Sequence, residues 1–220
     1  MTMLLAHRGD WRAAPENSLK ALVAGAAAPR SDGVEFDVHL AADGVPVVIH
    51  DEDLMRVQGV PHTVRSLPAA ALARHGVASL ADVLAALPQT AFLDVELKVV
   101  PNQALADVLL RARGPSPARA IISAFEAESL HEAAELLPGW ARWLNVEAAD
   151  DLYRAIATAR APGCAAISAE WQLITPRSAR AIQDAGLQLA AWTVRRRQTV
   201  ERLARLGVIA VCVEGSPLDR

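Results

Sequence analysis

The 220 residues are 52% hydrophobic and carry a formal net charge of −3, a composition typical of a folded globular protein and not of a disordered chain. Lys and Arg are scattered, so no basic face is available for a nucleic-acid backbone and we expect no nucleic-acid partner. The sequence has no apolar span of about twenty residues. We therefore expect no membrane insertion, a cytoplasmic location and one domain over residues 1–220.

Short apolar runs rich in β-branched residues alternate along the chain with Ala- and Leu-rich stretches at helical spacing. Strands that alternate with helices are typical of a parallel sheet covered by its own helices. The expected strands are residues 3–7, 33–38, 45–50, 91–97, 118–123, 142–146, 164–168, 187–194 and 208–213.

The connection between the second and third runs is too short for a helix. It reads FDVHLAADGVPVVIHD, and its Asp43-Gly44 pair is a hairpin signal. A two-residue turn there would pair positions whose numbers sum to 87, which places Asp37 opposite His50. We therefore expect a TIM-type (β/α)8 barrel of parallel strands, with residues 45–50 as an extra antiparallel strand beside the second. A doubly wound nucleotide-binding sheet is disfavoured because the first turn, HRGDWR, has a single glycine.

Polar and ionisable side chains stand at the ends of the first expected strands, and in a parallel barrel these ends open at one face. Each would be costly to bury without partners. The pairs are His7 and Arg8, Glu35 and Asp37, His50 and Asp51, and Glu96 and Lys98. The pattern predicts one site at the barrel mouth.

Three of these residues are carboxylates that converge on the same place. Glu35 and Asp37 are two apart on a strand, so their side chains point to the same side, and Glu96 joins them from another strand. Such carboxylates repel one another unless a cation lies between them, and an all-oxygen shell suits Mg²⁺ or Ca²⁺. The alternative is that they pair with Arg8 and Lys98 and bind no metal.

The remaining residues of the site suit phosphoryl chemistry. Arg8 and Lys98 supply the positive charge that a phosphate needs for binding and for charge stabilisation in the transition state. His7 and His50 can act as general base and general acid near neutral pH. Asp51 is expected either to accept a hydrogen bond from His50 or to cap a loop.

These motifs resemble those of the glycerophosphodiester phosphodiesterase family. The family elements read HRG, PENT, E-x-D, HD, E-x-K and a late aromatic-Thr-Val strand. In this sequence they read AHRG, PENS, VEFDVHLAADGVPVVIHD, DVELK and AWTV, in the same order and over nearly the whole chain.

The resemblance implies a TIM-barrel enzyme of lipid and glycerol metabolism. It would hydrolyse small phosphodiesters such as glycerophosphocholine or glycerophosphoethanolamine to an alcohol and glycerol 3-phosphate, as a monomer or homodimer. In this family a neighbouring hydroxyl of the substrate attacks phosphorus first, and water then opens the cyclic phosphate. The implied roles are catalysis by His7 and His50, metal binding by Glu35, Asp37 and Glu96, and phosphate binding by Arg8 and Lys98.

Three further residues match family positions. Glu16, in the PENS motif, would orient Arg8 or a site histidine. Trp192 would offer the substrate an apolar wall, or a cation-π face to a choline-like head group. Ser123 would lie near the mouth.

Two features depart from the family. Glu214, in VCVEGSP, stands where the family commonly has an aspartate within T-D-x-P. Residues 51–78 form an insertion over the barrel mouth that is short for the family. Two alternatives therefore stay open: a phospholipase D-like lyase, similar to the sphingomyelinase D group, that stops at the cyclic phosphate, and a degenerate barrel that binds phosphate without turnover.

Other polar residues are expected to have no part in the chemistry. We interpret His39 as a surface residue, Asp94 as structural, and the arginines at 195–197 as a solvated run.

Overall fold

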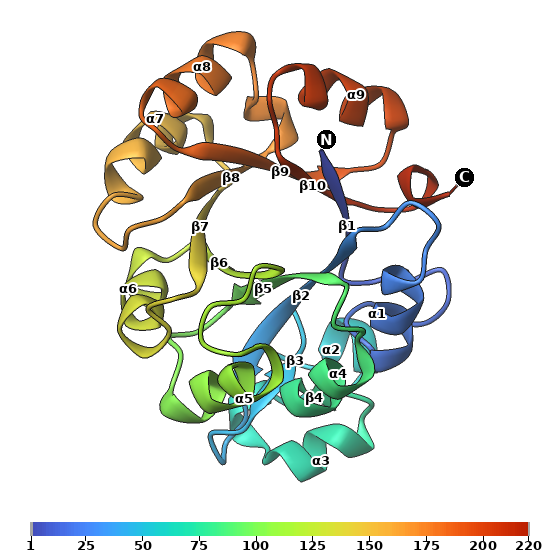
Figure 1. Ribbon diagram of the computed structural model, residues 1–220. Helices are drawn as coiled ribbons and strands as arrows, with labels where there is room; N and C mark the ends of the chain where they lie inside the picture. The colour runs from blue at the N-terminus through green and yellow to red at the C-terminus, as the bar shows by residue number, and fades with distance from the viewer. Residues whose placement is uncertain (1, 220) are drawn as a thin grey trace.

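The computed structural model describes residues 2–219, apart from the side chains of residues 150 and 151, and contains a closed barrel of parallel strands ringed by helices (Figure 1). The strands follow the order β1-β10-β9-β8-β7-β6-β5-β2, and β1 pairs with β2 to close the ring. The expected eight-stranded parallel barrel is confirmed. Its strands are β1 Met3–His7, β2 Gly33–Leu40, β5 Phe92–Leu97, β6 Ala120–Ala124, β7 Ala141–Val146, β8 Ala166–Glu170, β9 Gln188–Val194 and β10 Ala210–Val213.

Four of the helices, α1, α4, α5 and α8, start where the sequence provides a side chain that caps them. Ser18, Ser79, Asn102 and Thr175 each accept a hydrogen bond from a backbone N–H of the first turn. Among the described residues no helix is both long enough and apolar enough to cross a membrane. The helices are α1 Leu19–Ala26, α2 Met55–Gln58, α3 Ala69–Arg74, α4 Leu80–Ala86, α5 Gln103–Arg113, α6 Ala127–Leu136, α7 Ala149–Thr158, α8 Pro176–Asp184 and α9 Arg197–Arg205.

The inside of the barrel changes from apolar to polar along the strands, because successive side chains alternate between the two faces of a sheet. Near the start of the strands, inward side chains such as Phe92 and Trp143 stack at 6.1 Å between ring centroids and fill the barrel. Two residues further along the same strands the inward positions are Asp94 and Asn145. The apolar layer therefore closes one end, and the polar layer above it opens toward the carboxyl ends. The apolar cluster is Leu5, Phe92, Ile121, Trp143, Ala166, Ala190, Ala210 and Cys212.

The chain leaves the barrel after β2 to form the expected antiparallel strand, β3 Pro46–Val48, and a short further strand, β4 Ala78–Ser79, that was not expected. The predicted register is wrong by one residue: Val38 pairs with Val48, so paired numbers sum to 86. The N–H of Ile49, and not a group of His50, donates to the carbonyl of Asp37 at 3.0 Å.

The register differs because the hairpin loop has three residues. Ala41 N–H donates to Val45 C=O, and Gly44, at φ 76, takes the left-handed conformation that closes such a loop. The Asp43 carboxylate accepts the N–H of Ala69 at 3.2 Å, so it anchors the insertion to the loop.

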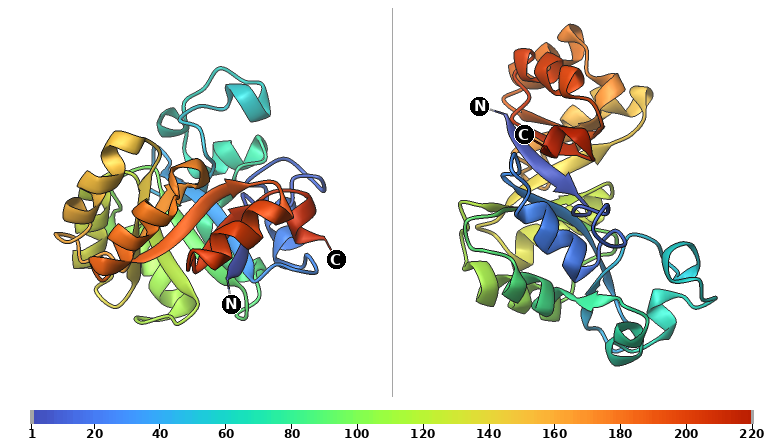
Figure 2. Two further views of the ribbon diagram at one scale, coloured as in Figure 1. Left: turned by 90° about the horizontal axis from the view of Figure 1, so that it is seen from above. Right: turned by 90° about the vertical axis from the view of Figure 1, so that its right-hand side faces the viewer.

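The insertion at 51–78 contributes Leu54, Val64 and Leu72 to a small hydrophobic cluster that it shares with the β2–β3 hairpin. It contains α2, the 3₁₀ turn Val64–Ser66, and α3. Figure 2 shows that this segment projects beyond the carboxyl ends of the strands at one edge of the barrel, next to β2 and β3.

His39 is not the surface residue that we expected. β2 continues to Leu40, which keeps His39 within the strand at 6% exposure. Its Nε2 lies 3.1 Å from the carbonyl oxygen of His50, and burial lowers the pKa of the imidazole. This contact ties the end of β2 to the segment that carries His50.

Candidate active site

Seven of the ten predicted site residues line one cavity of about 290 Å³ at the carboxyl ends of the strands. Both histidines, both cations and two of the three acids line it. Phe125, Asn145 and Thr193 line it as well, although the sequence analysis did not select them. From the predicted set the lining residues are His7, Arg8, Glu35, His50, Glu96, Lys98 and Trp192.

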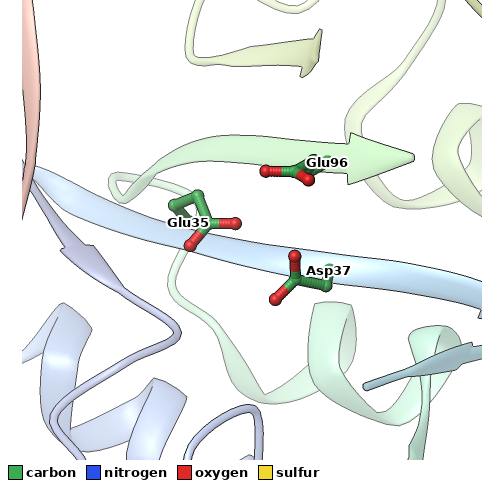
Figure 3. Close-up of side chains that lie close together, drawn as sticks. All are labelled: Glu35, Asp37 and Glu96. Atoms are coloured by element: carbon green, nitrogen blue, oxygen red, sulfur yellow. The ribbon is translucent and has the colours of Figure 1, made fainter. Parts of the chain in front are cut away.

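The three predicted metal ligands form one cluster. Asp37 and Glu96 are register partners on β2 and β5, and Glu35 lies two residues earlier on β2. One ligand oxygen from each lies within 4.8 Å of the others, and Figure 3 shows the three carboxylates facing one another. Glu35 and Asp37 are 3% and 0% exposed, so water screens their mutual repulsion very little.

The electrostatics of the cluster show the cost of this arrangement. Burial and the neighbouring carboxylates raise the pKa of Glu35 well above its usual range and that of Glu96 to about 7. The pKa of Asp37 is lowered: burial would raise it, but Lys98 Nζ and Arg8 Nε, each 3.2 Å from a carboxylate oxygen, outweigh that effect. Asn17 Nδ2 also donates to Asp37 at 2.7 Å.

The donor set of this cluster fits a hard divalent cation. All three ligands are carboxylates, which Mg²⁺ and Ca²⁺ prefer. Glu35 Oε2 accepts the N–H of Arg8 at 3.0 Å, whereas Glu35 Oε1 is buried and has no hydrogen-bond partner among the described residues. Buried carboxylate oxygens without partners are costly, and a bound cation would satisfy this one.

Arg8 and Lys98 lie on either side of Asp37. Arg8 is held at φ 56, and its Nη1 donates to Glu16 Oε1 at 2.9 Å, which agrees with the orienting role expected of Glu16. Lys98 Nζ contacts Glu96 and stands 5.5 Å from the ring centroid of Phe125. Two cations thus border the cluster at the cavity, where an anion can reach both.

His7 is oriented by Glu214. The His7 Nδ1 lies 2.8 Å from Glu214 Oε1, and Arg195 Nε donates to the other carboxylate oxygen at 2.6 Å. Burial would raise the pKa of Glu214, but His7 and Arg195 outweigh it and the pKa is lowered. His7 Nε2 is 3.8 Å from Glu35 Oε2, so it faces the cluster. Glu214, the residue that departs from the family pattern, therefore contacts a predicted catalytic histidine. Arg195, expected to be part of a solvated run, instead forms an ion pair with Glu214.

His50 has a matching arrangement. Its Nδ1 lies 2.7 Å from Asp51 Oδ1, the partner that we expected, and burial lowers the pKa of the imidazole. Arg56, on α2, donates through Nε to Asp51 Oδ2 and through Nη2 to Glu16 Oε1, both at 2.6 Å. One arginine of the insertion therefore links the carboxylate beside His50 to the carboxylate beside Arg8.

The two other predicted substrate contacts differ in their placement. Trp192 lines the cavity, where its Nε1 donates to the Ser168 carbonyl at 3.0 Å and its ring meets Phe125 edge-on at 5.5 Å between centroids. Ser123 is 1% exposed and donates to Asp94 Oδ1 at 2.6 Å. It thus supports Asp94, whose pKa burial raises to about 7, and Asp94 itself lines the cavity.

Sequence reasoning missed the residues whose partners are distant along the chain. Glu214 contacts a residue 207 positions away, and Arg56 reaches Glu16 across 40 positions. Asn17 belongs to the PENS motif, but its neighbour Ser18 alone serves as the helix cap. A signal was present for Glu214, since it directly follows the last barrel strand, at the face where catalytic residues of such barrels lie.

Three comparisons relate this chain to known proteins. The model described as the glycerophosphoryl diester phosphodiesterase family matches residues 7–215. A glycerophosphodiester phosphodiesterase of Caldanaerobacter subterraneus is 26% identical over 97% of this chain and 94% of its own. YqiK, an uncharacterised protein of Bacillus subtilis, is 32% identical over 94% of this chain and 92% of its own.

Two solved structures are similar to this chain over nearly its whole length. An Oleispira antarctica phosphodiesterase in complex with the product sn-glycerol-3-phosphate has a TM-score of 0.83 and 25% identity, covering 97% of this chain and 93% of that one. A Thermotoga maritima glycerophosphodiester phosphodiesterase, at 21% identity, has a TM-score of 0.80 over 97% of this chain and 94% of its own, which shows a shared fold.

The carboxylate cluster predicts how the stability of the metal-free protein depends on pH. Because the pKa of Glu96 rises from 4.5 to about 7 on folding, the folded state binds more protons than the unfolded state between these values. Stability therefore falls as pH rises through this window. We expect Glu96 to contribute roughly 2–3 kcal/mol to the difference in unfolding free energy between pH 5 and pH 8.

Urea unfolding in EDTA at both pH values, for the wild type and for Glu96→Gln, measures this contribution. The variant should lose much less stability between pH 5 and pH 8 than the wild type. Effects of His50, whose pKa is shifted in the opposite direction, occur in both proteins and largely cancel in the comparison. Equal pH dependence in the two proteins would contradict the predicted repulsion.

Proposed function

This chain belongs to the glycerophosphoryl diester phosphodiesterase family, and we propose that it hydrolyses glycerophosphodiesters to an alcohol and glycerol 3-phosphate with a divalent cation and two histidines. The single observation that carries the proposal is the cavity in which His7, His50, Arg8 and Lys98 surround the carboxylate cluster. The Oleispira antarctica relative in complex with the product sn-glycerol-3-phosphate supports the choice of substrate. Trp192 and Phe125 would face the head group of glycerophosphocholine or glycerophosphoethanolamine.

Glu35, Asp37 and Glu96 would hold the cation, Mg²⁺ or Ca²⁺. When bound, it would polarise a phosphoryl oxygen and offset the negative charge of the phosphate. Arg8 and Lys98 bind the remaining phosphate oxygens through charge-assisted hydrogen bonds. Asp37 keeps both cations in place, since each lies 3.2 Å from one of its oxygens.

The histidines move the protons. Each has its Nδ1 beside a carboxylate, Glu214 for His7 and Asp51 for His50, which leaves Nε2 to exchange a proton with the substrate. In the first step one histidine takes the proton of the glycerol hydroxyl next to the phosphoester carbon as its oxygen bonds to phosphorus. The bond from phosphorus to the alcohol oxygen breaks, and the other histidine protonates that oxygen. Water then opens the cyclic phosphate, and the histidines exchange roles.

The two alternatives give different products. A lyase would leave the cyclic phosphate as the final product, and a degenerate barrel would release nothing. The paired histidine–carboxylate contacts favour turnover, because a barrel that only binds phosphate would have no need of two oriented imidazoles.

Replacing either histidine should abolish the reaction. We expect His7→Ala and His50→Ala each to lower kcat by about 10²-fold or more, because each removes a proton-transfer group. Chelation by EDTA should stop the wild type, and Mg²⁺ or Ca²⁺ should restore it. Phosphorus NMR of the glycerophosphocholine reaction measures both the rate and the product.

His62→Ala is the matched control, since His62 is exposed on the insertion, and it should retain wild-type activity. Full activity of either site variant would refute the mechanism. Accumulation of a cyclic phosphate that never opens would instead identify a lyase.

Glu214 should act on the rate and not on substrate binding. Glu214 contacts His7 but is not one of the residues that line the cavity, so it would touch neither the phosphate nor the head group. Glu214→Gln should therefore lower kcat roughly 10- to 100-fold with little change in KM. Glu214→Asp keeps the charge and should recover part of the loss. Arg195→Gln, at a side chain that is 71% exposed, should have a small effect. A change in KM alone, or none at all, would show that Glu214 does not orient His7.

A further inference from the structure

One polar residue of the cavity has no role in the chemistry described above. Asn145 is the inward residue of β7 immediately above the apolar layer, it is 6% exposed, and it lines the cavity. Its Oδ1 is buried and has no hydrogen-bond partner among the described residues. Ser168, its register partner on β8, also lines the cavity. A buried oxygen acceptor without a hydrogen-bond partner is rare in folded proteins, so its presence at the cavity points to a ligand group that donates.

The missing partner is not the metal. Asn145 lies on β7, which two strand pairings, β7–β6 and β6–β5, separate from the strand of Glu96. The buried carboxylate oxygens that accept no hydrogen bond, on Glu35 and Asp37, belong to the metal cluster instead. The unpaired atom, Asn145 Oδ1, is a neutral acceptor that needs a donor. A hydroxyl group supplies such a donor without bringing a charge.

We infer that Asn145 and Ser168 form a hydroxyl-binding subsite that receives the terminal hydroxyl of the substrate's glycerol, an inference that rests on the proposed function. The depth of Asn145 and Ser168 in the cavity favours the glycerol end of the substrate. Trp192 lies nearer the mouth, since it pairs with Glu170, two residues beyond Ser168 on β8. The deep position takes the small end common to all glycerophosphodiesters, and the leaving alcohol, which varies in size, points outward.

The subsite determines specificity. Removing the terminal hydroxyl of the substrate would leave Asn145 Oδ1 buried and unpaired in the complex, and sites built to bind a hydroxyl discriminate strongly against analogues that lack it. The propane-1,2-diol analogue of glycerophosphocholine keeps the hydroxyl that attacks phosphorus and lacks the terminal one. It separates recognition from chemistry.

A second donor could reach Asn145, namely the ammonium of an ethanolamine head group. The two donors are distinguishable because choline has no N–H. An effect of Asn145 on glycerophosphoethanolamine alone would assign the subsite to the leaving group and overturn the inference.

The test combines Asn145→Leu, which keeps the size of the side chain, with the three substrates. For the wild type, kcat/KM should be about tenfold or more higher for glycerophosphocholine than for its propanediol analogue. Asn145→Leu should lose about that factor on both glycerol substrates and almost nothing on the analogue. Equal losses on all three substrates would overturn the inference while leaving the hydrolase function intact. Asn145→Ala repeats the comparison if the leucine variant does not fold.

Calorimetric binding of sn-glycerol 3-phosphate and of propane-1,2-diol 1-phosphate, in saturating Mg²⁺, tests the subsite without turnover. The wild type should bind the glycerol compound about tenfold more tightly, and Asn145→Leu should bind both equally. If the wild type binds the glycerol compound more tightly but hydrolyses no glycerophosphodiester, the proposed function is refuted and the subsite is upheld. Equal binding by the wild type would refute the subsite.

Discussion

Three carboxylates held within 4.8 Å of one another, two of them fully buried, are the constraint on which the rest of the site depends. Without positively charged partners, burying these carboxylates inside the barrel would cost a large amount of desolvation and repulsion energy. The structure offsets part of it with Arg8 and Lys98 and leaves one oxygen of Glu35 without a partner. The same charge balance that invites a divalent cation also places two cations where a phosphate must bind. The remaining charged residues then hold these groups in position.

That support comes from segments that are far apart in the chain. Glu214, directly after β10, orients His7, and Asp51 orients His50. Arg56 reaches in from the insertion to join Asp51 and Glu16, so the small segment at the barrel edge is tied to both the histidine and the phosphate-binding arginine. A short insertion therefore contributes to the site through one side chain that contacts two carboxylates.

The sequence predicts most of this architecture because the relevant signals are local. Three of these signals can be recognised from the sequence before the fold is known: the alternation of strands and helices, the polar residues at strand ends, and the two-residue spacing of Glu35 and Asp37. The register of β3 was missed by one residue because a left-handed Gly44 allows a three-residue loop as readily as a two-residue one. His39 was misplaced because β2 runs beyond the expected end. The contacts of Glu214 and Arg56 depend on how strands and insertion meet in space, which no local pattern encodes.

The central claim is that Glu35, Asp37 and Glu96 together bind one divalent cation. Anomalous diffraction from a crystal of the wild type soaked in Mn²⁺ tests it most directly, because Mn²⁺ shares the preference of Mg²⁺ for oxygen ligands. We expect a single strong anomalous peak between the three carboxylates, and its absence in a crystal of Asp37→Asn soaked in the same way. A wild-type crystal with no peak there, or with its peak elsewhere in the cavity, would show that these carboxylates do not form the cation site.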